Sequence, residues 1–206
     1  MSGHKPTEGL TLYEVLHGKD INKAIKDGDG FSIIVSDETL ARGEIDLVKA
    51  PRTVLKDALD NLETDFDVVL IDCPPSLNVL TIDALTASDE VIIPVQAQYL
   101  PLKGVARLRE TIEKTKASLN PSLKIGGVVV TFYDGRRNLD IQVRESLEKA
   151  FKAKVFKTAI SINTKIAEAP SHGLSIFKYA PRSRGAEQFR ELAAEIVKPQ
   201  KKRSKK

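Results

Sequence analysis

Apolar runs of strand length, continuous rather than alternating with polar residues, are the feature that most constrains the fold of this chain. Continuous runs suit strands whose two faces are both covered by helices, as in parallel sheets. Segments with helical spacing of apolar residues lie between them, so the order of elements predicts an α/β fold with a mostly parallel sheet. The expected strands are 31-FSIIVSD-37, 67-DVVLIDC-73, 90-EVIIPVQ-96, 124-KIGGVVVTFY-133 and 153-AKVFKTAIS-161.

Helices are expected wherever apolar residues recur every three or four positions. Asn138 is a suitable N-cap for the third of the segments below, and Gly18 is suited to close the last one. The expected helices are 50-APRTVLKDALDNLE-63, 103-KGVARLRETIEKTKASLN-120, 138-NLDIQVRESLEKAF-151, 185-GAEQFRELAAEIV-197 and 11-TLYEVLHG-18.

The positive charge of the chain is concentrated at one end. The last nine residues, 198-KPQKKRSKK-206, hold six of the 32 basic residues and no acid, so the remaining 26 basic residues face 28 acidic ones. We therefore expect one α/β domain over residues 1–197 and a disordered basic tail over residues 198–206. The tail is either a solvated end or a segment that binds phosphate without sequence preference.

No apolar run approaches the roughly 20 residues that span a bilayer, and the first twenty residues contain no apolar stretch typical of a signal peptide. The single cysteine, Cys73, excludes an internal disulfide framework and a cysteine-based zinc site. These observations favour a cytoplasmic protein without a membrane partner.

Ligands bind to open α/β sheets beyond the carboxyl ends of the strands. In this sequence, those ends carry polar residues within 72-DCPP-75, 94-PVQAQ-98, 131-TFYD-134 and 161-SIN-163. A carboxylate directly after a buried strand, as at Asp72, is suited to orient the water shell of Mg²⁺ beside a bound phosphate. The alternative is that backbone donors satisfy Asp72 and that it binds no ligand.

Four blocks carry a resemblance to a known family. They are 66-FDVVLIDCPPSLNVLTIDALTASDEVIIPVQ-96, 131-TFYDGRRNLDIQV-143, 163-NTKIAEAPSHG-173 and 179-YAPRSRGAEQF-189, and their order is that of the family. On these blocks the chain resembles the ParA/Soj partition ATPases, MinD-like P-loop proteins with a deviant Walker A motif. The resemblance implies a three-layer α/β fold of the P-loop NTPase type with a mostly parallel sheet.

The resemblance also implies a function, namely ATP-dependent partitioning of plasmid or chromosome DNA. Members of the family bind ATP and Mg²⁺, dimerise, bind DNA without sequence preference, and hydrolyse ATP when a ParB-type centromere-binding protein stimulates them. A member of this kind is expected in the cytoplasm, associated with the nucleoid.

Individual residues acquire expected roles from the same resemblance. Asp72 would be the Walker B carboxylate, which acts on the attacking water and holds Mg²⁺ through water, and Pro74 would stiffen the loop after it. Thr131 and Asn163 fall where the family builds its adenine pocket. The residues on the expected DNA-binding face are Arg136, Arg137, Lys165, Arg182 and Arg184, with Lys201, Lys202 and Arg203 of the tail. The alternative for these cations is ordinary solvated charge.

One part of the family pattern is not found. A phosphate-binding loop needs glycines followed by Lys-Ser or Lys-Thr, and Gly18-Lys19 is the one Gly-Lys pair, followed by Asp20. In the register of the family, the chain starts after the first β-α-β unit, which carries that loop and a central strand. We therefore expect no binding or hydrolysis of ATP by this chain alone. ATP and Mg²⁺ would be its cofactors only if a separate polypeptide supplied the loop.

Several alternatives stay open at this point. The gap in the sheet is filled by a second polypeptide or another copy, or the strands close up in a new order. The chain is then a partition protein with partner-supplied parts, a non-catalytic regulator that binds DNA or a full-length ParA, or a non-functional shortened remnant.

Overall fold

The computed structural model describes residues 9–97 and 102–200. The chain is α/β with a parallel three-stranded sheet, and it divides into two compact units. The described part of one unit comprises residues 91–97, 102–103 and 125–200, and that of the other comprises residues 9–90 and 104–124. None of the described helices is long and apolar enough to cross a membrane.

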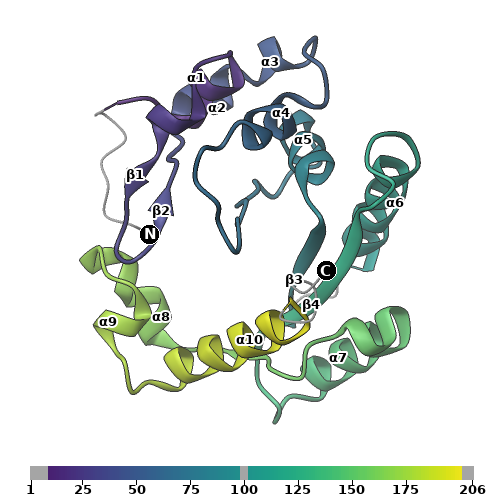
Figure 1. Ribbon diagram of the computed structural model, residues 1–206. Helices are drawn as coiled ribbons and strands as arrows, with labels where there is room; N and C mark the ends of the chain where they lie inside the picture. Colours follow the sequence, from purple (N-terminus) through teal and green to yellow (C-terminus); the bar gives the residue numbers. More distant parts are fainter. Residues whose placement is uncertain (1–8, 98–101, 201–206) are drawn as a thin grey trace. The chain divides into compact units, whose positions relative to one another are not determined.

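The three-stranded sheet lies in the first unit, except for the first residue of β3 and the first of β4. Figure 1 labels β3 and β4 of this sheet. Its strands are β3 (Glu90–Gln96), β4 (Lys124–Tyr133) and β5 (Ile160–Ser161), with β4 in the middle. β4 and β5 run parallel, with Thr131 opposite Ile160 and Tyr133 opposite Ser161. The extra residue between these two pairs is Phe132, whose φ is 54°. A bulge therefore ends the ladder at the carboxyl end of β4.

Burial on consecutive positions confirms that both faces of β4 are covered. Val128, Val129 and Val130 are all buried although their side chains alternate between the two faces. Val129 packs in a cluster with Ile160 and Leu192, joined by Ile92, Phe156, Ile166, Phe189 and Ile196. Phe189, Leu192 and Ile196 recur at helical spacing on α10 (Arg184–Gln200), so the apolar stripe of this helix covers the sheet.

Steric crowding within β4 favours glycine at position 127. A Cβ atom at this position would lie 2.2 Å from Cζ of Phe156, so the ring occupies the space of a side chain. Glycine in a strand commonly marks such a close approach.

The remaining helices of the first unit are α7 (Asn138–Phe151), α8 (Thr164–Glu168) and α9 (Ile176–Tyr179). Two 3₁₀ turns, Lys152–Lys154 and Ala169–His172, complete it. Val143, Leu147 and Phe151 form the buried stripe of α7.

The second unit contains short helices and a small antiparallel pair of strands. Two apolar clusters form its core, one around Leu16, Leu47, Leu55 and Ala84, and the other around Val15, Ile21 and Ala24. Its elements are α1 (Leu12–Leu16), the 3₁₀ helix Ile21–Ala24, β1 (Lys26–Asp27), β2 (Ser32–Ile33), α2 (Glu38–Arg42), α3 (Glu44–Leu47), α4 (Val54–Asp60), α5 (Val79–Ala87) and most of α6 (Leu102–Ser118).

The expected helices are confirmed, with ends that shift by a few residues. The expected helix over 138–151 matches α7, although its N-cap residue is Arg137 and Asn138 is its first helical residue. The helices 50–63, 103–120, 185–197 and 11–18 become α4, α6, α10 and α1, and Gly18 follows α1 with φ of 88°.

Two of the five expected strands are confirmed and three are wrong in part or whole. The strands 90–96 and 124–133 are β3 and β4. Only Ser32–Ile33 of 31–37 and Ile160–Ser161 of 153–161 are strand, although Val128 and Val155 form an isolated bridge. Residues 67–73 form no strand, because an apolar run becomes one only when a neighbouring strand satisfies its backbone. In Figure 1 they belong to the irregular stretch between α4 and α5.

Candidate functional site

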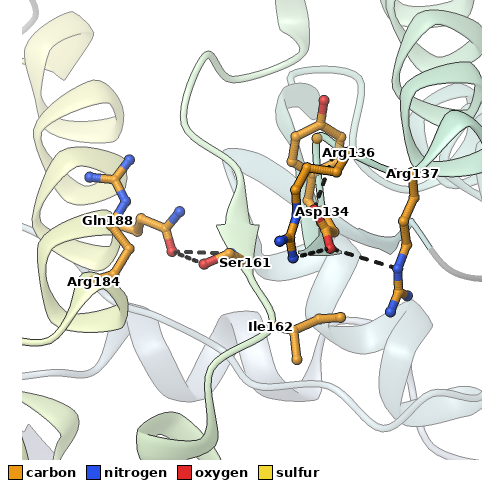
Figure 2. A pocket seen from close by; sticks show the side chains of 9 residues that line it. Asp134, Arg136, Arg137, Ser161, Ile162, Arg184 and Gln188 are labelled. Atoms are coloured by element: carbon orange, nitrogen blue, oxygen red, sulfur yellow. Dashed lines mark hydrogen bonds and ion pairs between the residues drawn. The ribbon is translucent and has the colours of Figure 1, made fainter.

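The carboxyl ends of β4 and β5 meet at a polar cavity of about 470 Å³ in the first unit. The loop after β4 provides one wall, Ser161 at the end of β5 and Ile162 after it provide the floor, and the first turns of α10 provide the other wall (Figure 2). The lining residues are Tyr133, Asp134, Gly135, Arg136, Arg137, Ser161, Ile162, Arg184 and Gln188. Three of these residues are arginines and none is a lysine, and guanidinium groups are suited to anions with several oxygens.

Asp134 pairs with both arginines of the loop after β4, Arg136 and Arg137. Its Oδ1 accepts from Nε of Arg136 and its Oδ2 accepts from Nη2, both at 2.9 Å, while Nε of Arg137 lies 3.7 Å from Oδ2. The hydrogen bond from the side chain of Arg136 is the main reason why the pKa of Asp134 falls from 3.8 to about 2. The same contact raises the pKa of the Arg136 guanidinium. Asp134 is thus ionised at neutral pH and holds two cations on one loop.

Asp140, in the first turn of α7, holds the loop itself. Its Oδ2 accepts from the backbone N–H of Asp134 at 2.8 Å, and Asp140 is almost fully buried. A buried carboxylate bonded to a backbone N–H fixes the position of that backbone closely. Phe132, two residues before Asp134, has a positive φ, which is strained for a residue other than glycine, and it lies in the same bend.

The opposite wall is held by polar contacts of α10. The backbone N–H and the hydroxyl of Ser161 both donate to Oε1 of Gln188, at 3.1 and 2.9 Å. Arg184 pairs with its helix neighbours, with Nη1 at 2.6 Å from Glu187 Oε2 and 3.8 Å from Glu191 Oε1. Ser183 caps the N-terminus of α10, because its Oγ accepts a hydrogen bond from the backbone N–H of Ala186.

The expected DNA-binding residues divide into three groups. Arg136, Arg137 and Arg184 line the cavity together. Lys165 lies on α8 outside it and pairs with Glu168 at 2.7 Å, and Arg182 is exposed just before α10. Lys201, Lys202 and Arg203 lie outside the described residues.

The expected nucleotide-site residues are not brought together in this way. Thr131, near the end of β4, accepts from the N–H of Ala97 through its carbonyl, and Asn163 caps α8 by accepting from the N–H of Lys165. Neither lines the cavity. Asp72 and Pro74 are exposed on the irregular segment of the other unit.

The sequence around Asp72 lacks positive charge. No residue from Asp57 to Leu102 is lysine or arginine, so this part of the sequence brings no positive charge to a phosphate. Among the described residues, no group of three or more His, Cys, Asp or Glu side chains could hold a metal ion.

Sequence reasoning missed the acids of this site. Each expected cation on the loop or helices, except Arg182, has a carboxylate two or three residues away that pairs with it. The spacing Lys165-Glu168 and Arg184-Glu187 is the helical i,i+3 pattern, which signals such pairs in advance. Asp140 offers no comparable signal, because its role depends on the bend after β4.

Comparisons with known proteins agree with this fold. A family model described as an AAA domain matches residues 2–125. The sporulation initiation inhibitor protein Soj of Bacillus subtilis is 48% identical over 171 residues, which cover 82% of this chain and 68% of that protein. The chromosome-partitioning ATPase Soj of Thermus thermophilus is 42% identical over 186 residues, covering 90% and 74%.

Solved structures match over nearly the whole chain. The cobyrinic acid a,c-diamide synthase of Mycobacterium smegmatis, solved with an ATP analog and magnesium, superposes with a TM-score of 0.82 at 33% identity. The match covers 95% of this chain and 75% of that one. A plasmid partition protein of Borrelia burgdorferi has a TM-score of 0.73 at 23% identity, covering 96% and 75%, and supports the fold.

Proposed function

This chain belongs to the ParA/Soj family of chromosome-partitioning ATPases, and from that membership we propose that it binds DNA without sequence preference during partitioning of a chromosome or plasmid. Relatives from three bacteria carry partitioning or Soj names, and one of them is named an ATPase. A role on DNA in the cytoplasm, at the nucleoid, follows from this proposal.

The observation that carries the proposal is the convergence of Arg136, Arg137 and Arg184 on one cavity at the end of the sheet. Guanidinium groups bind phosphate oxygens in pairs, and contacts to the phosphate backbone carry no sequence information. Lys165 and Arg182 extend the same positive set, as do Lys201, Lys202 and Arg203 of the basic tail.

The ion pairs of this site predict that the binding is weak. Phosphate must displace Asp134 from two arginines and Glu187 from a third. Exposed pairs of this kind contribute little to stability, so displacement is feasible at low salt. Salt should then reduce the affinity steeply, because each phosphate contact releases a counterion.

For the nucleotide, we propose that this chain needs a second polypeptide. The M. smegmatis relative was solved with an ATP analog and magnesium, whereas Asp72 here lies exposed in a stretch of sequence without lysine or arginine. A longer family member, or another copy of this chain, is the proposed partner in the dimer, and a ParB-type protein is the proposed activator. Regulation of such a longer member without catalysis is the second candidate, favoured by the same exposed Asp72.

The test is binding of a labelled random-sequence duplex DNA at several salt concentrations, measured by fluorescence anisotropy. Arg136→Ala and Arg184→Ala should each weaken binding and lower the slope of log affinity against log salt by about 1. The matched control is Arg42→Ala, which removes another exposed arginine, paired with Glu38 on α2.

Equal effects of the cavity variants and the control would contradict the proposed DNA site. Addition of ATP and Mg²⁺ tests whether this chain needs a second polypeptide. ATP turnover by the purified chain, abolished by Asp72→Ala, would overturn the need for a second polypeptide.

A further inference from the structure

A second cavity, of about 390 Å³, lies in the first unit beside the arginine-lined cavity at the end of β4. The two cavities share Tyr133, Arg184 and Gln188 as lining residues. The residues that line only the second cavity come from α7, from the segment before β5 and from α10, and they are Arg144, Lys157, Thr158, Ala159 and Glu191. None of these five residues belongs to the DNA site proposed above.

Two side chains hold the frame of the second cavity. Glu195 of α10 accepts hydrogen bonds from the backbone N–H groups of Lys157 at 2.9 Å and Thr158 at 2.8 Å, and from the hydroxyl of Thr158. Nη2 of Arg144 donates to the carbonyl of Lys157 at 3.2 Å, and its Nε donates to Glu148 at 2.9 Å. The segment before β5 is thus bonded to α7 on one side and to α10 on the other. A cavity framed in this way is formed before a ligand arrives.

Positive charge predominates on the wall of the second cavity. Arg144, Lys157 and Arg184 bring three cations, and Glu191 is the one acidic residue of the lining. The guanidinium carbon of Arg144 lies 5.7 Å from the centroid of the Tyr133 ring, a cation–π contact between two lining residues. The lining therefore favours an anion.

Gln188 adds a neutral donor to the wall that the two cavities share. Its side chain is buried, with 7% of the residue exposed, and its Oε1 accepts from the backbone N–H and the hydroxyl of Ser161. The amide nitrogen lies on the side away from Ser161 (Figure 2) and has no hydrogen-bond partner among the described residues. It is left to donate to a ligand, and phosphate oxygens are suitable acceptors.

The size of the second cavity and the depth of its arginine favour a small molecule over DNA. A volume of about 390 Å³ lies within the range of small-molecule sites, roughly 300–1,000 Å³. The side chain of Arg144 is only 25% exposed, whereas that of Arg136 on the DNA loop is 90% exposed. A phosphate in the backbone of a stiff duplex reaches an exposed guanidinium more readily than a recessed one.

We propose that the second cavity binds a small molecule with two linked phosphate groups, and that this ligand competes with DNA for Arg184. Arg144 and Lys157 hold one phosphate, while Arg184 and the amide nitrogen of Gln188 hold the other. Because Arg184 lines both cavities, a bound diphosphate removes one cation from the DNA site. Binding of the diphosphate is independent of the proposed function, and only the competition rests on it.

The probe is inorganic pyrophosphate, titrated into the full chain by calorimetry at constant ionic strength without Mg²⁺. Arg144→Gln and Lys157→Gln should each weaken its binding about tenfold, because each removes one charge-assisted contact. The matched control is Lys149→Gln, which removes an exposed lysine of α7 outside the cavity. Thermal melting by circular dichroism checks the fold of each variant. Lys157→Gln keeps the proposal testable if Arg144→Gln unfolds, since only the backbone of Lys157 bonds to Glu195 and Arg144.

Duplex DNA binding at the same ionic strength separates the two cavities. Arg136→Ala should weaken DNA and leave pyrophosphate binding unchanged, because Arg136 lines only the arginine-lined cavity. Arg184→Ala should weaken both ligands. Pyrophosphate should weaken DNA binding by the unaltered chain, and it should do so less for the Arg144→Gln variant.

Absence of pyrophosphate binding, or equal affinities in the two cavity variants and the Lys149→Gln control, overturns the proposal. A loss of pyrophosphate binding in Arg136→Ala alone also overturns it, because the ligand then lies in the arginine-lined cavity. If Arg144→Gln weakens DNA as much as pyrophosphate, the phosphate held there belongs to DNA and not to a small molecule. Selective pyrophosphate losses in a chain that binds no DNA would support the cavity and contradict the proposed function.

Discussion

Both carboxylate oxygens of Asp134 accept hydrogen bonds from the guanidinium of Arg136, at 2.9 Å each, on the wall of the arginine-lined cavity. The carboxylate occupies the positions that two phosphate oxygens would take on the guanidinium. A residue that orients Arg136 in the free chain is therefore also the competitor of any phosphate that binds there.

Replacement of Asp134 by asparagine should strengthen DNA binding. The amide keeps the shape of the side chain but loses its charge, so Arg136 and Arg137 face phosphate without an anionic rival. We expect a gain of a few fold in affinity, of the order that one exposed ion pair represents, measured by anisotropy at low salt. The control is Glu38→Gln, which frees the exposed Arg42 far from the cavity in sequence. Weaker binding by the Asp134→Asn variant would show that orientation of the arginines outweighs competition.

The ionisation of Asp134 should follow its contact with Arg136. The pKa of this carboxyl is lowered from 3.8 to about 2, so its contribution to folding is present above pH 3.8 and is lost as the pH falls toward 2. NMR titration of the side-chain carboxyl carbon should give a midpoint near 2 in the unaltered chain. Arg136→Ala should move that midpoint up toward 3.8. A midpoint that stays unchanged in this variant would assign the shift to another group.

Asp83 should limit stability at neutral pH. Its side chain is buried on α5, Arg52 lies 3.8 Å away without a hydrogen bond, and burial raises the pKa of the carboxyl despite that arginine. A raised pKa in the folded chain gives stability below pH 3.8 that is lost as the pH rises through the folded value. Asp83→Asn should therefore raise the unfolding temperature at pH 7 and lose this advantage in acid. Calorimetry at pH 7 and in acid measures both unfolding temperatures. A variant that is less stable than the unaltered chain at pH 7 would contradict this prediction.

Cys73 should react slowly with thiol reagents for an exposed cysteine. It is the one cysteine of the chain, and partial desolvation together with the charge of Asp72 raises its pKa above 9.0. Less thiolate is then present at neutral pH than in a free thiol. The labelling rate in native buffer should be below that in urea and should increase as the pH is raised. Asp72→Asn should accelerate the labelling. Equal rates in the unaltered chain and in this variant would exclude the carboxylate as a cause.

Gly127→Ala should destabilise the first unit, because its new methyl group would overlap the ring of Phe156. Overpacking of this kind costs about 1–3 kcal/mol, which urea unfolding followed by circular dichroism resolves. Phe156→Leu should recover part of the loss when the two changes are combined, and the double-mutant cycle isolates the coupling. Additive losses would place the cost elsewhere.

Long periodic segments of this chain were predictable from sequence, since the residues within them determine their structure. α7 and α10 follow from apolar stripes that are buried in the structure, and β4 follows from three consecutive valines that are all buried. The segment 67–73 has an equally strong pattern yet forms no strand. A strand depends on a partner, and the pattern of one segment does not say whether that partner is present.

The candidate site was predictable only in part for a related reason. The arginines at the end of β4 stand out in the sequence, and the family resemblance predicts a binding face there. Their charge balance depends on contacts such as Asp140 to the backbone of Asp134, which exist only because Phe132 bends the chain. Propensities along the chain do not encode such contacts.

The bond from the N–H of Asp134 to the buried Asp140 has a mechanical consequence. It joins the arginine loop to the first turn of α7, a helix of 14 residues whose other face is seated in the core. Loop and helix should then move as one rigid piece. A ligand that displaces the backbone of the arginine loop would therefore also have to displace the first turn of α7.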